Sequence, residues 1–291
     1  MSARISTYMN SPVYAVKPQD TLSYVRNIML SRNVSRIVVV DDNGRPVGVV
    51  TVSDIADIIA RRVENTLDEI LVRDVMTKNP IVIEENNTIK KAAYILLKNK
   101  IGGLPVVDKE GRLTGIITRT DIAKAFSERY KGVYTVEDIA RREVSTARRS
   151  HSISYIVKLI NADPSGKVVI VDENMKPVGV VAKRDIALLE PLMIARKGKE
   201  AYRKYKTETP KIEGRTVTAR AYIIPTAEDV MTPNPITAYL REDAAEAVSR
   251  MVSNSIGCLP VIDDNRVLRG ILTKIEVLAA LALGKKFLKH V

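Results

Sequence analysis

The sequence predicts an α+β fold built from four repeated β-α-β-β-α units. Two observations carry this prediction: one short phrase occurs four times along the 291 residues, and the signals around it follow one order. Because self-similarity at a regular spacing reveals architecture before any single residue does, the chain is divided first into repeats.

Each copy of the phrase begins with a glycine in an apolar, strand-like run and ends six positions later with an acid. Midway between the two, three of the copies have a threonine: Thr51, Thr118 and Thr273. The glycines are separated by 67, 64 and 91 residues, so one interval is stretched. The copies are Gly48–Asp54, Gly115–Asp121, Gly179–Asp185 and Gly270–Glu276.

The second unit shows the expected order of elements most clearly. Asn87 and Thr88 offer a helix cap, and Asp121 opens the closing helix. Residues 109–112 form a turn between two apolar runs. The expected elements are a strand at 80–83, a helix at 89–97, strands at 104–108 and 113–118, and a helix at 122–129.

Longer segments show that the units come in two pairs. Pro46–Val50 recurs identically as Pro177–Val181, and Asp74–Ile81 is matched by Asp229–Ile236. One unit is too small to bury its own sheet, so adjacent units should pack in pairs related by a pseudo-two-fold axis. The expected modules are 1–133, with units at about 5–62 and 70–130, and 134–291, with units at about 136–189 and 226–284, an insertion at 190–225 and a tail at 285–291.

Composition excludes several classes of protein. The single cysteine, Cys258, cannot form an internal disulfide, and two histidines cannot build a histidine-rich metal cluster. No segment reaches the roughly 18 uninterrupted apolar residues of a membrane helix, and the start of the chain lacks a signal-peptide pattern. We therefore expect a cytoplasmic protein without a membrane partner or a metal.

Positive charge gathers in the insertion and the tail. These two segments carry eight of the twelve excess positive charges, which favours a polyanionic partner. In a helix expected from Pro191, the cations at 196, 199, 203 and 206 share a face, and tyrosines at 202 and 205 suit base stacking. The alternative is a solvated helix with its tyrosines against the module. The candidate RNA-binding residues are Arg196, Lys197, Lys199, Tyr202, Arg203, Lys204, Tyr205, Lys206, Lys285, Lys286 and Lys289.

The motifs of the second unit resemble those of the CBS domain family, named after cystathionine β-synthase. Asp74–Ile81, Ile101–Asp108 and Gly115–Asp121 carry the resemblance in order, and it covers nearly the whole chain apart from the basic insertion and tail. The arrangement is similar to archaeal-type stand-alone CBS proteins with two tandem pairs. The resemblance implies a regulatory, non-catalytic protein whose paired domains form a cleft for AMP, ADP, ATP or a related adenosyl ligand such as S-adenosylmethionine.

The resemblance also implies roles for individual residues. Asp54 and Asp121 would hold ribose, and Thr51 and Thr118 would face phosphate. Adenine would lie near the backbone of Val34, Ser35 and Arg36 or of Ile101, Gly102, Gly103 and Leu104. In the second module the matching positions are Asp185, Thr273 and Glu276, where Ala182 replaces a hydroxyl and glutamate replaces aspartate. Each phrase alone is also what a helix N-cap prefers, so capping is the alternative function.

No phosphate loop, zinc-ligand spacing or nucleophile elbow is present in the sequence, so no catalytic residue is expected. The leading hypothesis is a protein that senses adenine nucleotide and binds RNA or a ribonucleoprotein, specifically the ribosome, to damp translation. The competing hypothesis is a nucleotide- or S-adenosylmethionine-responsive regulator of a partner enzyme or transporter. The sequence leaves open whether two chains form a homodimer.

Deletion of residues 191–215 should reduce retention of the chain by total RNA or ribosomal particles. If six phosphates are neutralised, the log–log slope of affinity against salt should be about −4 to −5. Equal retention of the intact and deleted chains would remove the RNA hypothesis.

Overall fold

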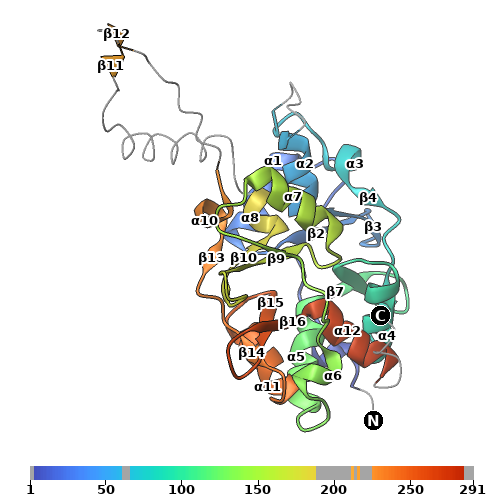
Figure 1. Ribbon diagram of the computed structural model, residues 1–291. Helices are drawn as coiled ribbons and strands as arrows, with labels where there is room; N and C mark the ends of the chain where they lie inside the picture. Colours follow the sequence, from blue (N-terminus) through green and yellow to red (C-terminus); the bar gives the residue numbers. More distant parts are fainter. Residues whose placement is uncertain (1–2, 61–65, 188–210, 213–214, 217–224, 285–291) are drawn as a thin grey trace. The chain divides into compact units, whose positions relative to one another are not determined.

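The computed structural model describes residues 3–60, 66–187, 211–212, 215–216 and 225–284 (Figure 1). These residues fall into two compact units. The first unit comprises Met1–Arg142, Thr237–Asp264 and Arg269–Val291, and the second comprises Glu143–Ile236 and Asn265–Leu268. The expected helix from Pro191 lies outside the described residues.

The first two repeats lie in the first unit, and each has its own small sheet. In the first repeat β1 pairs parallel with β2, and β2 and β3 pair antiparallel. The second repeat follows the same plan with β5, β6 and β7. The elements are 3-10 helix η1 Ile5–Thr7, β1 Ala15–Val16, α1 Leu22–Ser31, β2 Arg36–Val40, β3 Pro46–Thr51, α2 Val52–Ala60, α3 Val72–Val75, β4 Thr77–Lys78, β5 Ile83–Glu84, α4 Ile89–Lys98, β6 Gly103–Val107, β7 Leu113–Thr118, α5 Arg119–Arg129 and α6 Val136–Ile139.

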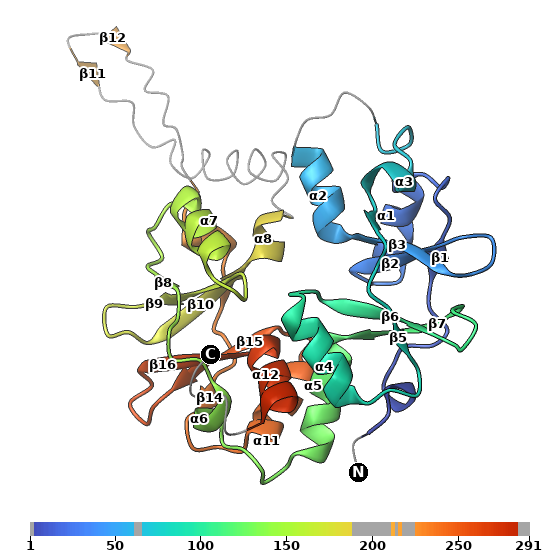
Figure 2. The same ribbon diagram turned by 90° about the vertical axis from the view of Figure 1, so that its right-hand side faces the viewer.

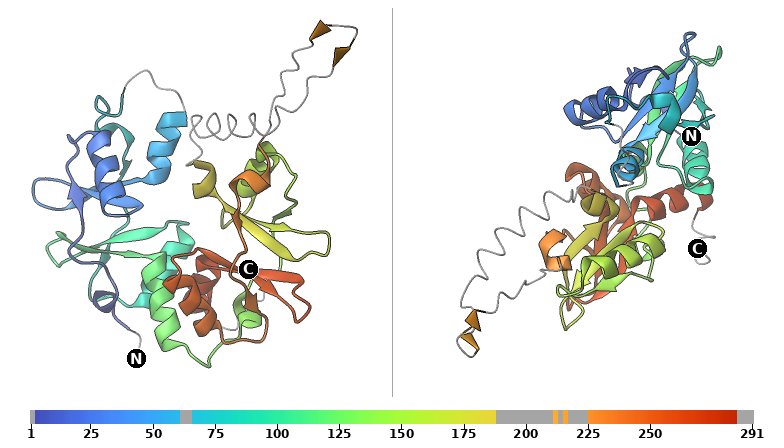
Figure 3. Two further views of the ribbon diagram at one scale, coloured as in Figure 1. Left: turned by 90° about the vertical axis from the view of Figure 1, so that its left-hand side faces the viewer. Right: turned by 90° about the horizontal axis from the view of Figure 1, so that it is seen from above.

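The fourth repeat completes the first unit and shares a core with the second repeat. Helix α12 packs against α4 and α5, and α11 packs against α5 (Figure 2; Figure 3, left). Phe126 of α5 and Leu278 of α12 belong to the same buried cluster, which also takes in Met251 of α11. The elements are β14 Ala238–Tyr239, α11 Ala244–Ser253, β15 Cys258–Ile262, β16 Leu268–Thr273 and α12 Lys274–Leu283.

The second unit is built on the third repeat. Its sheet has the order β13-β10-β9-β8, and Ile156, Ile170 and Val181 lie in its core. A two-stranded hairpin, β11–β12, pairs Lys211 with Thr216. The elements are β8 Thr146–Ala147, α7 Ile153–Ala162, β9 Lys167–Val171, β10 Pro177–Ala182, α8 Lys183–Ala187, β11 Lys211–Ile212, β12 Arg215–Thr216, α10 Ala227–Val230 and β13 Thr232–Pro233.

Each repeat's sheet is extended by a segment that comes from outside that repeat's own β-α-β-β-α run. Strand β4, which precedes the second repeat, pairs with β3 of the first. In return, Asn10 exchanges two backbone hydrogen bonds with Ile116 of β7, at 2.9 and 3.0 Å. Arg141 makes the same bridge to Ile271 of β16. These exchanged segments tie the repeats together through backbone hydrogen bonds, which depend little on side-chain identity.

The repeated glycine is required where the exchanged segment crosses the strand. A Cβ on Gly48 would overlap the Met76 side chain, and a Cβ on Gly270 would lie 2.7 Å from the carbonyl oxygen of Arg141. The phrase therefore begins with glycine because another segment lies directly on that position.

The predicted fold class is confirmed, with four small mixed α+β repeats in the expected element order. One expected strand was wrong: residues 80–82 form no strand, and β5 is limited to Ile83–Glu84. Pro80 has no N–H to donate, and Ile81 and Val82 are exposed. The division into modules at residues 133 and 134 stays a prediction.

Substitution of Gly270 by alanine should lower the free energy of unfolding by about 2–3 kcal/mol, since the new Cβ meets the carbonyl of Arg141, whose backbone is held by two hydrogen bonds to Ile271. Gly48→Ala should cost less, because the flexible Met76 thioether can move aside. Urea titration of both variants measures the difference. An equal or smaller loss for Gly270→Ala would contradict this account of the phrase.

Candidate functional site

A cavity of about 500 Å³ lies in the first unit. This volume is within the range of roughly 300–1,000 Å³ that small-molecule sites occupy. The N-terminal segment contributes Asn10 and residues 12–14, the loop before β2 contributes residues 33–36, and the second repeat contributes Gly102, Ile116 and residues 118–120. Lys274 of the fourth repeat completes the lining. This cavity is called the cleft below.

The guanidinium of Arg36 lies against the backbone of Gly102 and Gly103. A Cβ on Gly102 would stand 2.5 Å from Nη2 of Arg36, and Gly103 is approached just as closely. The sequence had suggested that these glycines admit adenine, whereas in the structure they admit an arginine from the first repeat. Only glycine leaves room for this contact.

Arg36 is electrostatically strained in this position. Its Nε atom is buried and has no hydrogen-bond partner among the described residues. Burial lowers the pKa of Arg36, the charge of Arg119 lowers it further, and Asp121 partly offsets the effect. Burial also lowers the pKa of Arg119, whose Nε donates to the Ile101 carbonyl at 3.0 Å. Two partly desolvated arginines therefore line the same cleft, which favours an anionic ligand.

Thr118 and Asp121 form the cap of α5. The Thr118 backbone N–H and its hydroxyl both donate to Oδ2 of Asp121 at 2.7 Å. Asn10, which lines the cleft, donates from Nδ2 to Oδ1 at 3.1 Å. The capping alternative is therefore realised, and Thr118 lines the cleft while it caps. Asp121 does not itself line the cleft, but it accepts a hydrogen bond from Asn10, which does.

The first repeat has the same N-cap, but its residues do not line the cleft. The Thr51 N–H and hydroxyl both donate to Oδ2 of Asp54 at 2.7 Å. Neither residue lines the cleft, although Val34 and Ser35 do. The Ser35 carbonyl accepts from the Val52 N–H at 3.0 Å, which links the cleft wall to the start of α2.

The matching positions of the third and fourth repeats are engaged within the protein. Asp185 accepts from the Ala182 N–H at 2.8 Å in the second unit. In the fourth repeat, the Thr273 N–H donates to Oε2 of Glu276 at 2.9 Å, and the Thr273 hydroxyl contacts the same oxygen. The other oxygen of Glu276 lies 3.4 Å from Nε of Arg141, and both side chains are mostly buried.

The fourth repeat therefore uses its acid for an internal ion pair. Strand register places Arg141 opposite Ile271 as Asn10 is placed opposite Ile116, so the two residues hold equivalent positions. Where the second repeat has a neutral amide beside its aspartate, the fourth has an arginine beside a glutamate. Both carboxylate oxygens of Glu276 already have partners, which disfavours ribose binding there.

The structure brings Val34, Ser35, Gly102 and Thr118 together in the cleft, and places Ile101, Gly103 and Asp121 next to it. Asn10, Arg119 and Lys274 were not predicted as site residues, and Arg36 was expected to contribute its backbone near adenine rather than its guanidinium. A signal existed for two of them: the residue after the hydroxyl position is basic in three repeats, at Arg119, Lys183 and Lys274. The predicted RNA-binding residues at 196–206 and 285–289 lie outside the described residues.

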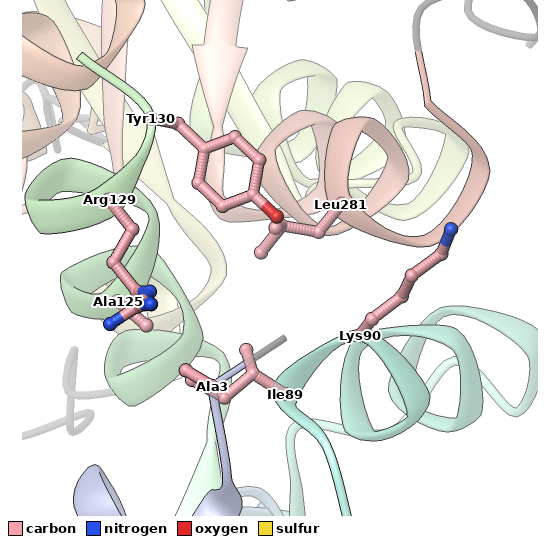
Figure 4. Close-up of a pocket in the computed structure, with 7 residues that line it drawn as sticks. All are labelled: Ala3, Ile89, Lys90, Ala125, Arg129, Tyr130 and Leu281. Atoms are coloured by element: carbon pink, nitrogen blue, oxygen red, sulfur yellow. The ribbon is translucent and has the colours of Figure 1, made fainter. Parts of the chain in front are cut away.

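A second, smaller cavity of about 140 Å³ lies elsewhere in the first unit. Lys90 of α4 and Arg129 of α5 approach it from opposite sides, with Tyr130 and Leu281 between them (Figure 4). It is too small for a nucleotide and includes no predicted site residue.

Cys258 is buried. In the ranges that the structure describes, no helix is long and apolar enough to cross a membrane. Across those same ranges, no group of three or more His, Cys, Asp or Glu residues is placed to hold a metal ion.

All four repeats match the model of one known protein family. The CBS domain model matches residues 5–61, 72–128, 136–190 and 227–283. The chain belongs to the CBS domain family. The basic insertion falls between the third and fourth CBS domains.

Two relatives come from Methanocaldococcus jannaschii. L-aspartate semialdehyde sulfurtransferase is 41% identical over 120 residues, and the match covers 41% of this chain but 23% of that protein. Protein MJ1225 is 25% identical over 282 residues, covering 92% of this chain and 95% of its own. The crystal structure of MJ1225 has the same fold, with a TM-score of 0.72, 24% identity and coverage of 96% of this chain and 100% of that one.

Two solved CBS pairs that resemble part of the chain hold adenosyl ligands. The pair of protein MJ0100 is in complex with 5'-methylthioadenosine and S-adenosyl-L-methionine (26% identity, 44% of this chain, 99% of that chain, TM-score 0.41). CBSX2 is in complex with AMP (28% identity, 43% of this chain, 97% of that chain, TM-score 0.37).

Replacement of Arg141 by methionine should lower the free energy of unfolding by about 3 kcal/mol, because it leaves the Glu276 carboxylate buried without its cation. Arg142→Met is the matched control, since Arg142 pairs with Glu137 on the surface and should change stability by less than about 1 kcal/mol. Urea titration measures both. Equal effects would show that the buried pair has no structural role.

Proposed function

We propose that this CBS protein binds an adenine nucleotide in the cleft of its first two repeats and, without catalysing a reaction, regulates a partner protein according to ligand occupancy. The observation that carries the proposal is that two arginines, Arg36 and Arg119, line the cleft, with a buried, unpaired Nε on Arg36. Membership in the CBS family supplies the ligand class.

The charge of the cleft favours nucleotides over a sulfonium ligand. Arg36, Arg119 and Lys274 line it, and no aspartate or glutamate is among its described lining residues. A phosphate would offset the repulsion between the arginines and accept charge-assisted hydrogen bonds from both. S-adenosylmethionine carries a sulfonium cation, which these same residues would repel.

Other lining residues suit the rest of a nucleotide. Val13, Val34 and Ile116 give an apolar wall on which a purine ring can pack. Asn10 presents an amide that can donate to ribose or phosphate oxygens, and the Thr118 hydroxyl oxygen, whose proton goes to Asp121, can accept from a ribose hydroxyl. The geometry thus offers an apolar wall, neutral polar groups and cations in one cavity.

Arg36 is also free to adjust. A guanidinium whose Nε has no acceptor is not fixed by that hydrogen bond and can turn to meet a phosphate. The movement would alter the contact with Gly102 and Gly103, where the first repeat meets the second. Ligand binding would therefore be transmitted between repeats, as a regulator requires.

RNA or ribosome binding and a cytoplasmic location stay predictions from the sequence. Membership in the CBS family supports the alternative, a nucleotide-responsive regulator of a partner enzyme or transporter.

Calorimetry with AMP, ADP, ATP and S-adenosylmethionine tests the proposal. The intact chain should bind at least one nucleotide at least about ten-fold more tightly than S-adenosylmethionine. Arg36→Met should weaken nucleotide binding about ten-fold or more, since a charge-assisted contact is lost.

Stability separates a ligand residue from a structural one. Arg36→Met should leave the free energy of unfolding without ligand unchanged or raise it by about 1–3 kcal/mol, because it removes an unpaired buried donor. Arg112→Met, which removes an exposed partner of Asp108, is the control and should change neither binding nor stability appreciably. Nucleotide affinity unchanged by Arg36→Met would contradict the proposal.

A further inference from the structure

The smaller cavity of the first unit is separate from the cleft. Its volume is about 140 Å³, and its lining shares no residue with that of the cleft. One water needs about 10–15 Å³, so this cavity has room for an anion of a few heavy atoms. Helix α5 runs from one cavity to the other, since its first two residues line the cleft while Ala125 and Arg129 line the smaller cavity.

Two cations from different helices face the smaller cavity. Lys90 of α4 and Arg129 of α5 lie on opposite sides of it (Figure 4). Among the described residues, neither side chain forms an ion pair, and no aspartate or glutamate lines the cavity. Two cations that face one small cavity repel each other, and an anion between them would replace that repulsion by attraction.

The acid next to Arg129 in the chain is already engaged. Oε2 of Glu128 accepts a hydrogen bond from the Tyr8 hydroxyl at 2.8 Å. Burial raises the pKa of Tyr8, the hydrogen bond to Glu128 raises it further, and Arg129 partly offsets the effect. Tyr8 therefore stays a neutral phenol at neutral pH and offers Arg129 no negative charge.

A tyrosine hydroxyl adds a third hydrogen-bond donor. The ring of Tyr130 stacks on that of Phe126, with centroids 5.2 Å apart and planes 4° from parallel. Because Phe126 is fully buried, the stacking holds the Tyr130 ring in place. The Tyr130 hydroxyl points into the space between the two cations and has no hydrogen-bond partner within the described ranges (Figure 4).

The backbone adds to the positive potential of the cavity. Ile89 and Lys90, which both line it, are the first two residues of the ten-residue helix α4. The N-terminal end of a helix carries a partial positive charge, which acts in the same direction as the two side-chain cations.

We propose that the smaller cavity binds a small tetrahedral oxyanion, either inorganic phosphate or the phosphate of a short phosphomonoester, independently of nucleotide binding in the cleft. Lys90 supplies a point charge, Arg129 can donate two parallel N–H groups to two oxygens, and the Tyr130 hydroxyl donates to a third. The anion would link α4 to α5, the helix whose first residues line the cleft. The rest of the lining is apolar and limits the size of the ligand: Ala3, Ile89, Ala125 and Leu281.

Calorimetry with inorganic phosphate, at an ionic strength held constant with chloride, tests the assignment on the full chain. The Arg36→Met chain is titrated as well, because the cleft could also hold phosphate. One saturable phosphate site should remain in that chain, and adding Lys90→Met or Arg129→Met should each weaken it about ten-fold or more. Lys91→Met is the matched control, since Lys91 is exposed on α4 and does not line the cavity. It should change the affinity by less than about two-fold.

Two further measurements separate charge from packing and identify the source of the phosphate. Arg129→Lys keeps the charge and should bind phosphate more tightly than Arg129→Met, whereas equal affinities would trace the loss to packing and contradict the proposal. Titration with glycerol 3-phosphate distinguishes a free anion from a phosphomonoester by which of the two binds more tightly.

Two results would overturn the proposal. One is the absence of saturable phosphate binding in the Arg36→Met chain, and the other is an equal loss in Lys91→Met, which would show only a general attraction to surface cations. Neither result bears on nucleotide binding by the cleft, which is tested separately.

Discussion

The backbone pairing of Asn10 with Ile116 brings the N-terminal segment onto the sheet of the second repeat, and the cleft depends on that placement. Gly115 permits the crossing, since a Cβ there would lie 2.9 Å from the Asn10 carbonyl oxygen. The pairing carries Asn10 to Asp121 and places residues 12–14 along the cleft wall. In the same way, strand β4 pairs with β3 and extends the sheet of the first repeat. The site is therefore a consequence of how the repeats exchange segments.

Once the repeats are joined in this way, Arg36 of the first repeat lies against the second repeat. It begins β2, and its guanidinium lies across Gly102 and Gly103, where no side chain stands in its way. Placing it beside Arg119 lowers the stability of the empty protein, because a desolvated cation and an unpaired donor are both unfavourable. Proteins tolerate such strain mainly at functional sites, where a ligand relieves it.

The four repeats share a fold but have separate chemistry. The second repeat keeps aspartate beside a neutral amide, while the fourth replaces this arrangement by the buried pair of Arg141 and Glu276 and packs its helices against those of the second. The repeat that supports the core through α12 also contributes Lys274 to the cleft.

The fold and part of the site could be predicted from the sequence because their determinants are local. The phrase from Gly115 to Asp121 contains its own strand, cap and helix start, so β7, α5 and the Thr118–Asp121 contacts followed from it. The cation cluster could not be predicted in this way. Arg36 and Arg119 are 83 residues apart, and Lys274 is farther still. In a chain with many basic residues, no local pattern predicts which of them will line the same cavity.

A crystal structure of the full chain grown with ADP tests the central claim most directly. The account predicts ADP in the first-unit cleft, with a phosphate oxygen within roughly 3.2 Å of a guanidinium nitrogen of Arg36. ADP bound only at another repeat, or a cleft in which the Arg36 guanidinium keeps its place against Gly102 and Gly103 without touching phosphate, would contradict it.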